Sequence, residues 1–300
     1  MAERDQGGDR DGERLSDEPA VSIIIPCNDD THLSALFQSL LEQQHPPRFE
    51  VILVDASGRD LDARVQAWGK RLNLRIIPAE KDASAAENRN TGVAVATADA
   101  LVFIDADDTV NASFVRAMAD ALDAHDVVCC SVDMIALNPW NPDGTHPQQS
   151  GLITRDMAFL PFAGGGTLAI RRSLFDEIGG WDTSMRFYHE ADFCWKIQLS
   201  GHPPPHFVKD AILHYRLDPT PDGRWRRTVG LGRAEPLLFK RYRRAGMPRE
   251  SPLEVMGGWL GIVGDAVRSL LGNRVAGLGY RAAIRIGRIQ GSWRHRVMYL

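Results

Sequence analysis

Three carboxylates within four residues, Asp105, Asp107 and Asp108, form the strongest candidate for chemistry in the chain. They directly follow residues 100–104, an apolar run of strand length that is rich in β-forming residues. Ligands of open α/β sheets bind beyond the carboxyl ends of the strands, which is where this cluster would lie. Neighbouring carboxylates repel one another unless a cation or ligand neutralises them, and their oxygens suit Mg²⁺ or Mn²⁺. The cluster therefore indicates a divalent metal that bridges to a phosphate.

A structural interpretation of the same residues is also open. The cluster could be a solvated turn in which Asp108 caps a helix over residues 110–124, because acidic side chains at a helix start accept its free N–H groups. The cluster alone does not distinguish a metal site from a helix cap. The elements around it have to decide between the two.

The segment before the strand has the features of a helix. Ser84 and Glu87 have the spacing of a capping box, in which each side chain accepts a hydrogen bond from a backbone N–H at the helix start. Ala86, Val93 and Ala94 recur at helical spacing and give this helix a narrow packing face.

Other apolar runs predict the rest of a sheet. They lie at residues 21–25, 49–54, 74–77, 126–136 and 207–214. Helical stretches separate most of them, which favours βαβ units and an α/β fold, with a mostly parallel sheet flanked by helices. Proline 26 closes the first run, and Asp55 follows the second. Right-handed crossovers would place Asp55 and Asp105 at the same edge, one for a base or ribose and the other for metal and phosphate.

Two common nucleotide-binding motifs do not occur in the sequence. The turn after the first predicted strand, residues 26–30, has no Gly-x-Gly-x-x-Gly, and the P-loop pattern Gly-x-x-x-x-Gly-Lys-[Ser/Thr] is not found. These features exclude a dinucleotide-binding domain and a P-loop NTPase. A later cluster, Gly164 to Gly166, predicts either close approach of the backbone to a ligand or a flexible turn.

The composition is that of an ordinary globular protein. The chain has 300 residues, 44% hydrophobic and 25% charged, and no apolar run reaches the roughly 20 residues of a membrane span. Residues 1–17 are charged and Gly-rich, do not have the apolar core of a secretory signal, and are predicted to be disordered. The four cysteines show neither zinc-site nor disulfide spacing, which fits reduced thiols in a cytoplasmic protein.

The charge is distributed unevenly along the chain. From Arg224 onward about sixteen Lys and Arg accompany about four Asp and Glu, although the formal net charge of the whole chain is −4. We therefore predict a catalytic domain over residues 18–222 and a basic, mainly helical C-terminal extension over residues 223–300. Aromatic residues are not regularly interleaved with the basic ones, so nucleic acid is not expected as a partner. The extension could pack on the catalytic domain or lie on the inner face of the membrane.

Two further candidates lie in the second half of the chain. A predicted helix over residues 188–201 carries Glu190 and Asp192 in its first turn. Acids at that position are favoured by the helix dipole, but Glu190 could also act as a general base. His214 ends the last predicted strand and could be either a structural residue or a metal ligand.

Taken in order, these segments resemble the family-2 glycosyltransferases, enzymes of the GT-A fold that use nucleotide-sugars. The resemblance extends over residues 20–215. It is carried by the opening strand at 21–28, the strand and acid at 51–58, the Arg-Asn-x-Gly helix and Asp-x-Asp motif at 87–108, and the acceptor-side segments at 165–196.

The resemblance implies an inverting, metal-dependent transfer. The donor would be a UDP-, GDP- or dTDP-sugar, and the acceptor hydroxyl would belong to a glycan, a lipid-linked sugar or a small molecule. The implied roles place Pro26, Asp55, Arg89 and Asp105 on the donor nucleotide, Asp107 and His214 on Mg²⁺ or Mn²⁺, and Glu190 as the catalytic base.

The sequence departs from the family at a few positions. The pair His189-Glu190 stands where most relatives have Glu-Asp, so the base keeps its carboxylate but is one methylene longer. No Gln-x-x-Arg-Trp motif follows, which argues against a processive synthase. Two alternatives stay open: a protein that binds a nucleotide without transfer, and a sugar nucleotidyltransferase. The second would need a Gly-rich, basic phosphate loop after the first strand, which the sequence does not have.

Overall fold

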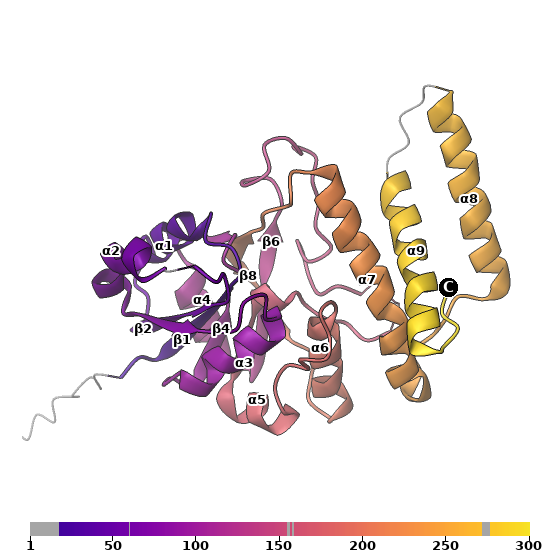
Figure 1. Ribbon diagram of the computed structural model, residues 1–300. Coiled ribbons are helices and arrows are strands. Elements are labelled where there is room, and N and C mark those ends of the chain that lie inside the picture. Colours follow the sequence, from indigo (N-terminus) through magenta and orange to yellow (C-terminus); the bar gives the residue numbers. More distant parts are fainter. Residues whose placement is uncertain (1–17, 60, 155–156, 158, 272–276) are drawn as a thin grey trace, which may run out of the picture.

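The computed structural model describes residues 18–59, 61–154, 157, 159–271 and 277–300. The predicted disordered tail, residues 1–17, lies outside the described residues. In this part of the chain, an eight-stranded sheet has the order β3-β2-β1-β4-β7-β6-β8-β5 (Figure 1). Its strands are β1 (Val21–Cys27), β2 (Phe49–Asp55), β3 (Leu74–Pro78), β4 (Ala100–Phe103), β5 (Thr109–Val110), β6 (Val127–Asp133), β7 (Leu168–Arg171) and β8 (His206–His214).

The direction of the strands determines where the candidate site can lie. β1 pairs in parallel with β2 and β4, β2 pairs in parallel with β3, and β6 pairs in parallel with β8. β7 runs antiparallel between β4 and β6, and β5 runs antiparallel to β8. The sheet is therefore mixed but mostly parallel, as predicted. The carboxyl ends of β1, β2 and β4 meet at one edge, and the reversal of β7 is a feature that the sequence did not predict.

Helices cover both faces of the sheet. They are α1 (Leu33–Leu41), α2 (Asp62–Leu72), α3 (Ala85–Val95), α4 (Phe114–Leu122), α5 (Arg172–Ile178) and α6 (His189–Leu199). Successive residues of a strand point to opposite faces, so Ile23 packs with α1, α2 and α4, whereas Ile24 packs with α3, α5 and α6. This three-layer arrangement confirms the predicted α/β architecture (Figure 1).

Local predictions around the acidic strand have different outcomes. The capping box before α3 is present: Ser84 accepts from the Glu87 N–H, and Glu87 accepts from the Ser84 N–H. The helix predicted from residue 110 instead begins at residue 114 with Ser113 as its N-cap, so Asp108 does not cap it. β1 also continues past Pro26 to Cys27. Proline is tolerated there because β4 pairs with β1 only as far as Ile24.

The C-terminal extension is helical. It contains α7 (Pro221–Tyr242), the short 3₁₀ helix η2 (Arg243–Ala245), α8 (Pro252–Leu270) and α9 (Leu278–His295). The predicted boundary at residue 222 falls in the first turn of α7. Gly232, Gly287 and Gly291 let the backbones of α7 and α9 approach closely, and α8 stands on the outer side of α9 (Figure 1). Among the described helices, none combines the length and hydrophobicity that a membrane crossing requires.

Candidate active site

Two adjoining pockets open at the carboxyl edge of the sheet. The Asp107 pocket, of ≈ 500 Å³, is lined by the end of β1, the acidic turn after β4 and the segment after β8. The Glu190 pocket, of ≈ 260 Å³, is lined by the start of α6, the glycine turn before β7 and part of α7. Ala85, Asp105 and Arg227 line both pockets. The acidic turn and the predicted base therefore open into neighbouring spaces that share a carboxylate and a cation.

The acidic turn is held by the segment that follows β8. Arg216 donates from its backbone N–H to Asp108 Oδ1 (2.8 Å) and from Nε to the backbone oxygen of Asp107 (2.8 Å). Asp108 is 1% exposed, so its carboxylate serves this contact and not a helix cap. The side chain of Asp107 is left to face solvent in the pocket.

The position of the carboxylates in a pocket, together with the repulsion between them, raises the pKa values of Asp107 and Asp108. Loss of surrounding water, followed by the charge of Asp105, raises the pKa of Asp107 to about 6, although Arg227 and Arg216 oppose the rise. Burial, then the charges of Asp107 and Asp105, raises the pKa of Asp108 well above its usual range. The turn thus holds three carboxylates close together, and a cation bound at Asp107 would relieve their repulsion.

Arg89 lies in a tight cage beneath both pockets. It is 2% exposed, donates from Nη2 to Asp105 Oδ1 (2.5 Å) and from Nη1 to His189 Nε2 (2.7 Å), and stacks over Trp181. The glycine turn makes room for this cage, because a Cβ at Gly165 would lie 2.7 Å from Arg89 Nη1 and a Cβ at Gly166 would lie 2.7 Å from Asp105 Oδ2. The glycines are therefore needed for close packing around Arg89 and Asp105.

The two acids in the first turn of α6 lie in different surroundings, one buried and one in a pocket. Asp192 is fully buried and receives hydrogen bonds from Arg241 (3.0 Å) and Tyr242 (2.8 Å), which tie α6 to α7. Glu190 instead lines the pocket, with Oε2 at 3.5 Å from Nδ1 of His189. Tyr188, just before the helix, adopts a left-handed conformation (φ 58°) that turns the chain into this position.

His189 has a defined orientation. Its Nε2 accepts from Arg89, so a neutral ring carries its proton on Nδ1, the atom that faces Glu190. Burial lowers the pKa of His189; the charge of Glu190 opposes this and that of Arg89 adds to it, and the net lowering favours the neutral ring. A continuous series of contacts therefore runs from Asp105 through Arg89 and His189 to Glu190.

The structure brings only some of the predicted residues together. Pro26, Asp105 and Asp107 line the Asp107 pocket, and Arg89, Asp105 and Glu190 line the Glu190 pocket. Asp55 lies at the same edge of the sheet, beside Cys27, but it is not among the described residues that line either pocket. Its carboxylate accepts from the N–H of Ser57.

His214 takes a different place from the one implied for a metal ligand. Its Nδ1 is 2.7 Å from Asp133 Oδ2, and it lines neither pocket. Within the described residues, no three His, Cys, Asp or Glu side chains converge as a ready-made metal site. The donor set still suits a hard cation, because the carboxylates of Asp105 and Asp107 line one pocket and repel one another. Asp107 could hold such an ion together with oxygens supplied by a bound diphosphate.

Sequence reasoning missed several residues of the site. Arg216 and Arg227 bring two positive charges to the Asp107 pocket, and His146 lines the Glu190 pocket. Arg216 directly follows the last predicted strand, which is a signal that could have been used. Arg227 lies on α7 more than a hundred residues from the acidic turn, so no spacing rule links the two.

Residues 22–179 match the sequence profile of Glycosyl transferase family 2, so the chain belongs to that family. A relative from Haemophilus influenzae, named an uncharacterized glycosyltransferase, is 26% identical over 200 residues, which are 65% of this chain and 67% of the relative. The chain thus spans about two thirds of the length of such curated relatives.

The fold agrees with solved glycosyltransferase structures. The mannosyltransferase PcManGT from Pyrobaculum calidifontis, solved with GDP-Man and Mn²⁺, has a TM-score of 0.63 at 16% identity, over 93% of this chain and 88% of that one. Residues 1–349 of Staphylococcus aureus TarS, solved with UDP-GlcNAc, give a TM-score of 0.52 at 19% identity, over 93% of both chains. The fold is therefore GT-A, with a C-terminal helical region.

Proposed function

We propose that this protein is an inverting, metal-dependent glycosyltransferase that moves a sugar from a nucleotide-diphosphate sugar to an acceptor hydroxyl. The observation that carries the proposal is the pair of adjoining pockets in which Asp107 and Glu190 face spaces that share Asp105 and Arg227. Solved relatives of the same fold contain a nucleotide-sugar, one of them with Mn²⁺. Family membership favours transfer over the activity of a sugar nucleotidyltransferase.

The donor would bind in the Asp107 pocket and the acceptor in the Glu190 pocket. Asp105 and Pro26 would contact the donor nucleotide, with Asp55 further along the same edge, and Asp107 would hold Mg²⁺ or Mn²⁺ against the diphosphate. A bound metal stabilises the charge that develops on the leaving nucleoside diphosphate. Arg216 and Arg227 would add positive charge on the same side.

Glu190 would act on the acceptor. It removes the proton from the acceptor hydroxyl while the hydroxyl oxygen attacks the anomeric carbon from the face opposite the nucleotide. A new glycosidic bond forms, the bond from the anomeric carbon to the phosphate oxygen breaks, and the anomeric configuration inverts. The acceptor itself, whether glycan, lipid-linked or small molecule, would enter through the Glu190 pocket.

The test uses a panel of UDP-, GDP- and dTDP-sugars with the full chain. We expect one donor to bind and to be slowly hydrolysed only with Mn²⁺ or Mg²⁺, and Asp107→Asn to lose this activity. Asp210→Asn, which changes an exposed acid on β8, is the matched control. If the wild type binds no donor in the panel while remaining folded, the proposal in this form is wrong.

A second variant separates transfer from binding. Glu190→Gln removes the base but keeps the shape of the side chain, so we expect kcat to fall by roughly a hundredfold or more while donor binding persists. Glu177→Gln, an exposed acid on α5 that pairs with His202, should leave kcat unchanged. Donor binding without turnover in the wild type, with any acceptor offered, would instead favour the non-catalytic alternative, which the long Glu190 side chain keeps open.

A further inference from the structure

The outer face of α8 is apolar and uncovered. Its exposed hydrophobic side chains recur at alternating steps of three and four residues, which places them on one face of the helix. Together we call them the α8 stripe: Leu253, Met256, Leu260, Val263, Val267 and Leu270, each between 52% and 87% exposed. None of the residues of α8 is buried. Soluble proteins rarely expose an apolar surface of this extent without a partner.

Within the described residues, the rest of the fold does not cover this face. α8 meets α9 through its opposite side, where Gly258 lies against the Arg285 guanidinium and Asp265 pairs with Arg281. Beside the stripe, Gly257, Gly261 and Gly264 have open space around them, and the exposed Arg268 lies on the same side of the helix. The stripe therefore points away from the protein, as Figure 1 shows for α8 as a whole.

Among the described residues, arginines without salt bridges gather at one end of the helical hairpin that α8 and α9 form. Arg243 and Arg244 lie in η2, Arg249 lies three residues before α8, and Arg294 and Arg296 lie at the end of α9. Glu250 binds both Arg285 and Arg288 of α9, which brings the start of α8 to the end of α9. All five arginines are exposed, and none forms a salt bridge within the described part of the chain.

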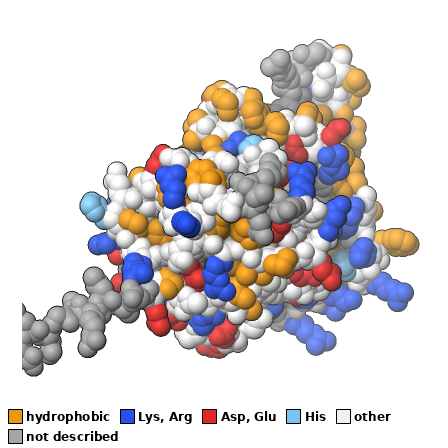
Figure 2. All heavy atoms as spheres, turned by 60° about the vertical axis from the view of Figure 1, so that its left-hand side comes forward, with side chains coloured by type: hydrophobic (Ala, Val, Ile, Leu, Met, Phe, Trp, Pro, Cys, Tyr) orange, Lys and Arg blue, Asp and Glu red, His pale blue; other side chains and the backbone are white. Residues whose placement is uncertain are grey.

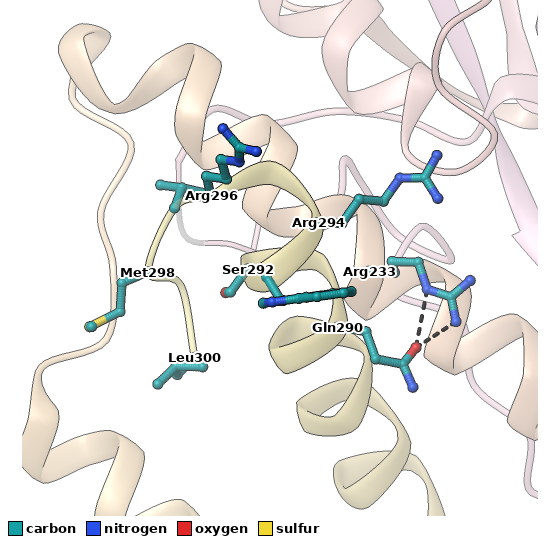
Figure 3. Close-up of a pocket in the computed structure, with 9 residues that line it drawn as sticks. Arg233, Gln290, Ser292, Arg294, Arg296, Met298 and Leu300 are labelled. Atoms are coloured by element: carbon teal, nitrogen blue, oxygen red, sulfur yellow. Dashed lines mark hydrogen bonds between the residues drawn. The ribbon is translucent and has the colours of Figure 1, made fainter.

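The same end of the hairpin exposes further apolar groups. A hollow of ≈ 940 Å³ is lined there by Trp293, Val297 and Met298, with Arg294 and Arg296 at its rim. Trp293 is 87% exposed and Met298 is 69% exposed. Figure 3 shows the two arginines and Met298 reaching out from the C-terminal end of α9. Figure 2 shows hydrophobic side chains along the upper right edge of the molecule, with Lys and Arg side chains below them.

We propose that the α8 stripe and this arginine cluster dock the protein on an anionic lipid bilayer, with α8 lying in the plane of the membrane surface. An apolar helix face buries its side chains among the lipid chains, tryptophan is favoured at the interface, and arginines bind anionic headgroups. This surface lies outside both pockets and does not depend on the proposed reaction.

A second copy of the chain fits the surface less well. A symmetric dimer would bring the same patch against itself, so the arginines would need acids to meet. The acids of α8 are already engaged, because Asp265 pairs with Arg268 and Arg281 and Glu254 caps Ser251. The positions that carry charges beside a coiled-coil seam are here glycine, alanine and tryptophan.

Vesicle sedimentation with the full chain tests the proposal. We expect binding to vesicles of phosphatidylcholine with phosphatidylglycerol, weaker binding to phosphatidylcholine alone, and a loss of binding at high salt. The double variant Leu260→Asp/Val263→Asp should lower the partition coefficient by roughly tenfold or more, because it places two charges in the stripe. Exchange of Arg243, Arg244 and Arg249 for Gln should remove the preference for anionic lipid.

The control variant is Leu199→Asp, which changes a side chain that is 48% exposed at the end of α6, away from the hairpin. It should bind vesicles like the wild type. Equal binding with and without phosphatidylglycerol would overturn the proposal, and so would unchanged binding of the double variant. A dimer in solution that the double variant converts to a monomer, with no vesicle binding by the wild type, would assign the stripe to a second copy instead.

Discussion

His189 connects the donor side of the site to the predicted base. Arg89 donates to its Nε2, and its Nδ1 faces Glu190 Oε2 at 3.5 Å. A neutral imidazole accepts from Arg89 and turns its protonated Nδ1 toward Glu190.

We expect His189→Leu to act through the position of Glu190. The variant removes the ring that lies between Arg89 and Glu190, so kcat should fall by roughly tenfold with little change in the KM for the donor. His202→Leu, which removes a histidine paired with Glu177 outside the site, is the control. A large change in the KM for the donor with an unchanged kcat would contradict this role.

At the scale of elements, two helices begin with the same capping box but differ in what they bury. α3 starts at Ser84 and packs Ala86 and Val93 into the core beneath β1 and β2. α8 starts at Ser251 and buries no residue. The capping contacts are alike, since each serine accepts from the N–H of a glutamate three residues on.

Comparing these two helices shows whether the loss of a capping contact destabilises the whole domain or only the helix that it caps. Ser84→Ala should lower the free energy of unfolding by about 1 kcal/mol, because α3 forms only when the whole domain folds. Ser251→Ala should leave the global transition unchanged and reduce only the helicity of α8. Urea unfolding followed by tryptophan fluorescence and circular dichroism distinguishes the two. Equal losses of global stability in both variants would mean that α8 folds cooperatively with the sheet.

At the scale of the whole molecule, a half-buried histidine makes stability depend on pH. His146 lines the Glu190 pocket, and its Nδ1 accepts from the N–H of Gln148 (3.0 Å). Burial, followed by the charge of Arg227, lowers the pKa of His146 from 6.5 to about 4. Between these values the unfolded chain binds a proton that the folded chain does not. The free energy of unfolding should therefore decrease as the pH falls through this interval.

His146→Asn should reduce this dependence, because asparagine can still accept from Gln148 but does not titrate. Urea unfolding at about pH 7 and at about pH 4.5 should show a smaller loss for the variant than for the wild type. His45→Asn, at an exposed position with a left-handed backbone, is the control and should behave like the wild type. Parallel losses in the wild type and His146→Asn would contradict this account.

The sequence by itself determined the α/β architecture and part of the site. Alternating apolar runs and helical stretches predicted the mostly parallel sheet, because the period of hydrophobic residues is a local property. The same logic placed Asp105 and Asp107 beyond β4 and Glu190 in the first turn of α6, since each lies beside the element that positions it.

The tertiary structure decided how these parts meet. The contacts from Asp105 through Arg89 and His189 to Glu190 span three segments of the chain, and Arg227 reaches the site from a helix predicted to belong to the extension. The reversal of β7, the bond of His214 to Asp133 and the place of Asp55 outside the pockets also depend on packing between distant residues. Sequence patterns report which face of an element is apolar, but only the folded chain shows that the α8 stripe stays uncovered.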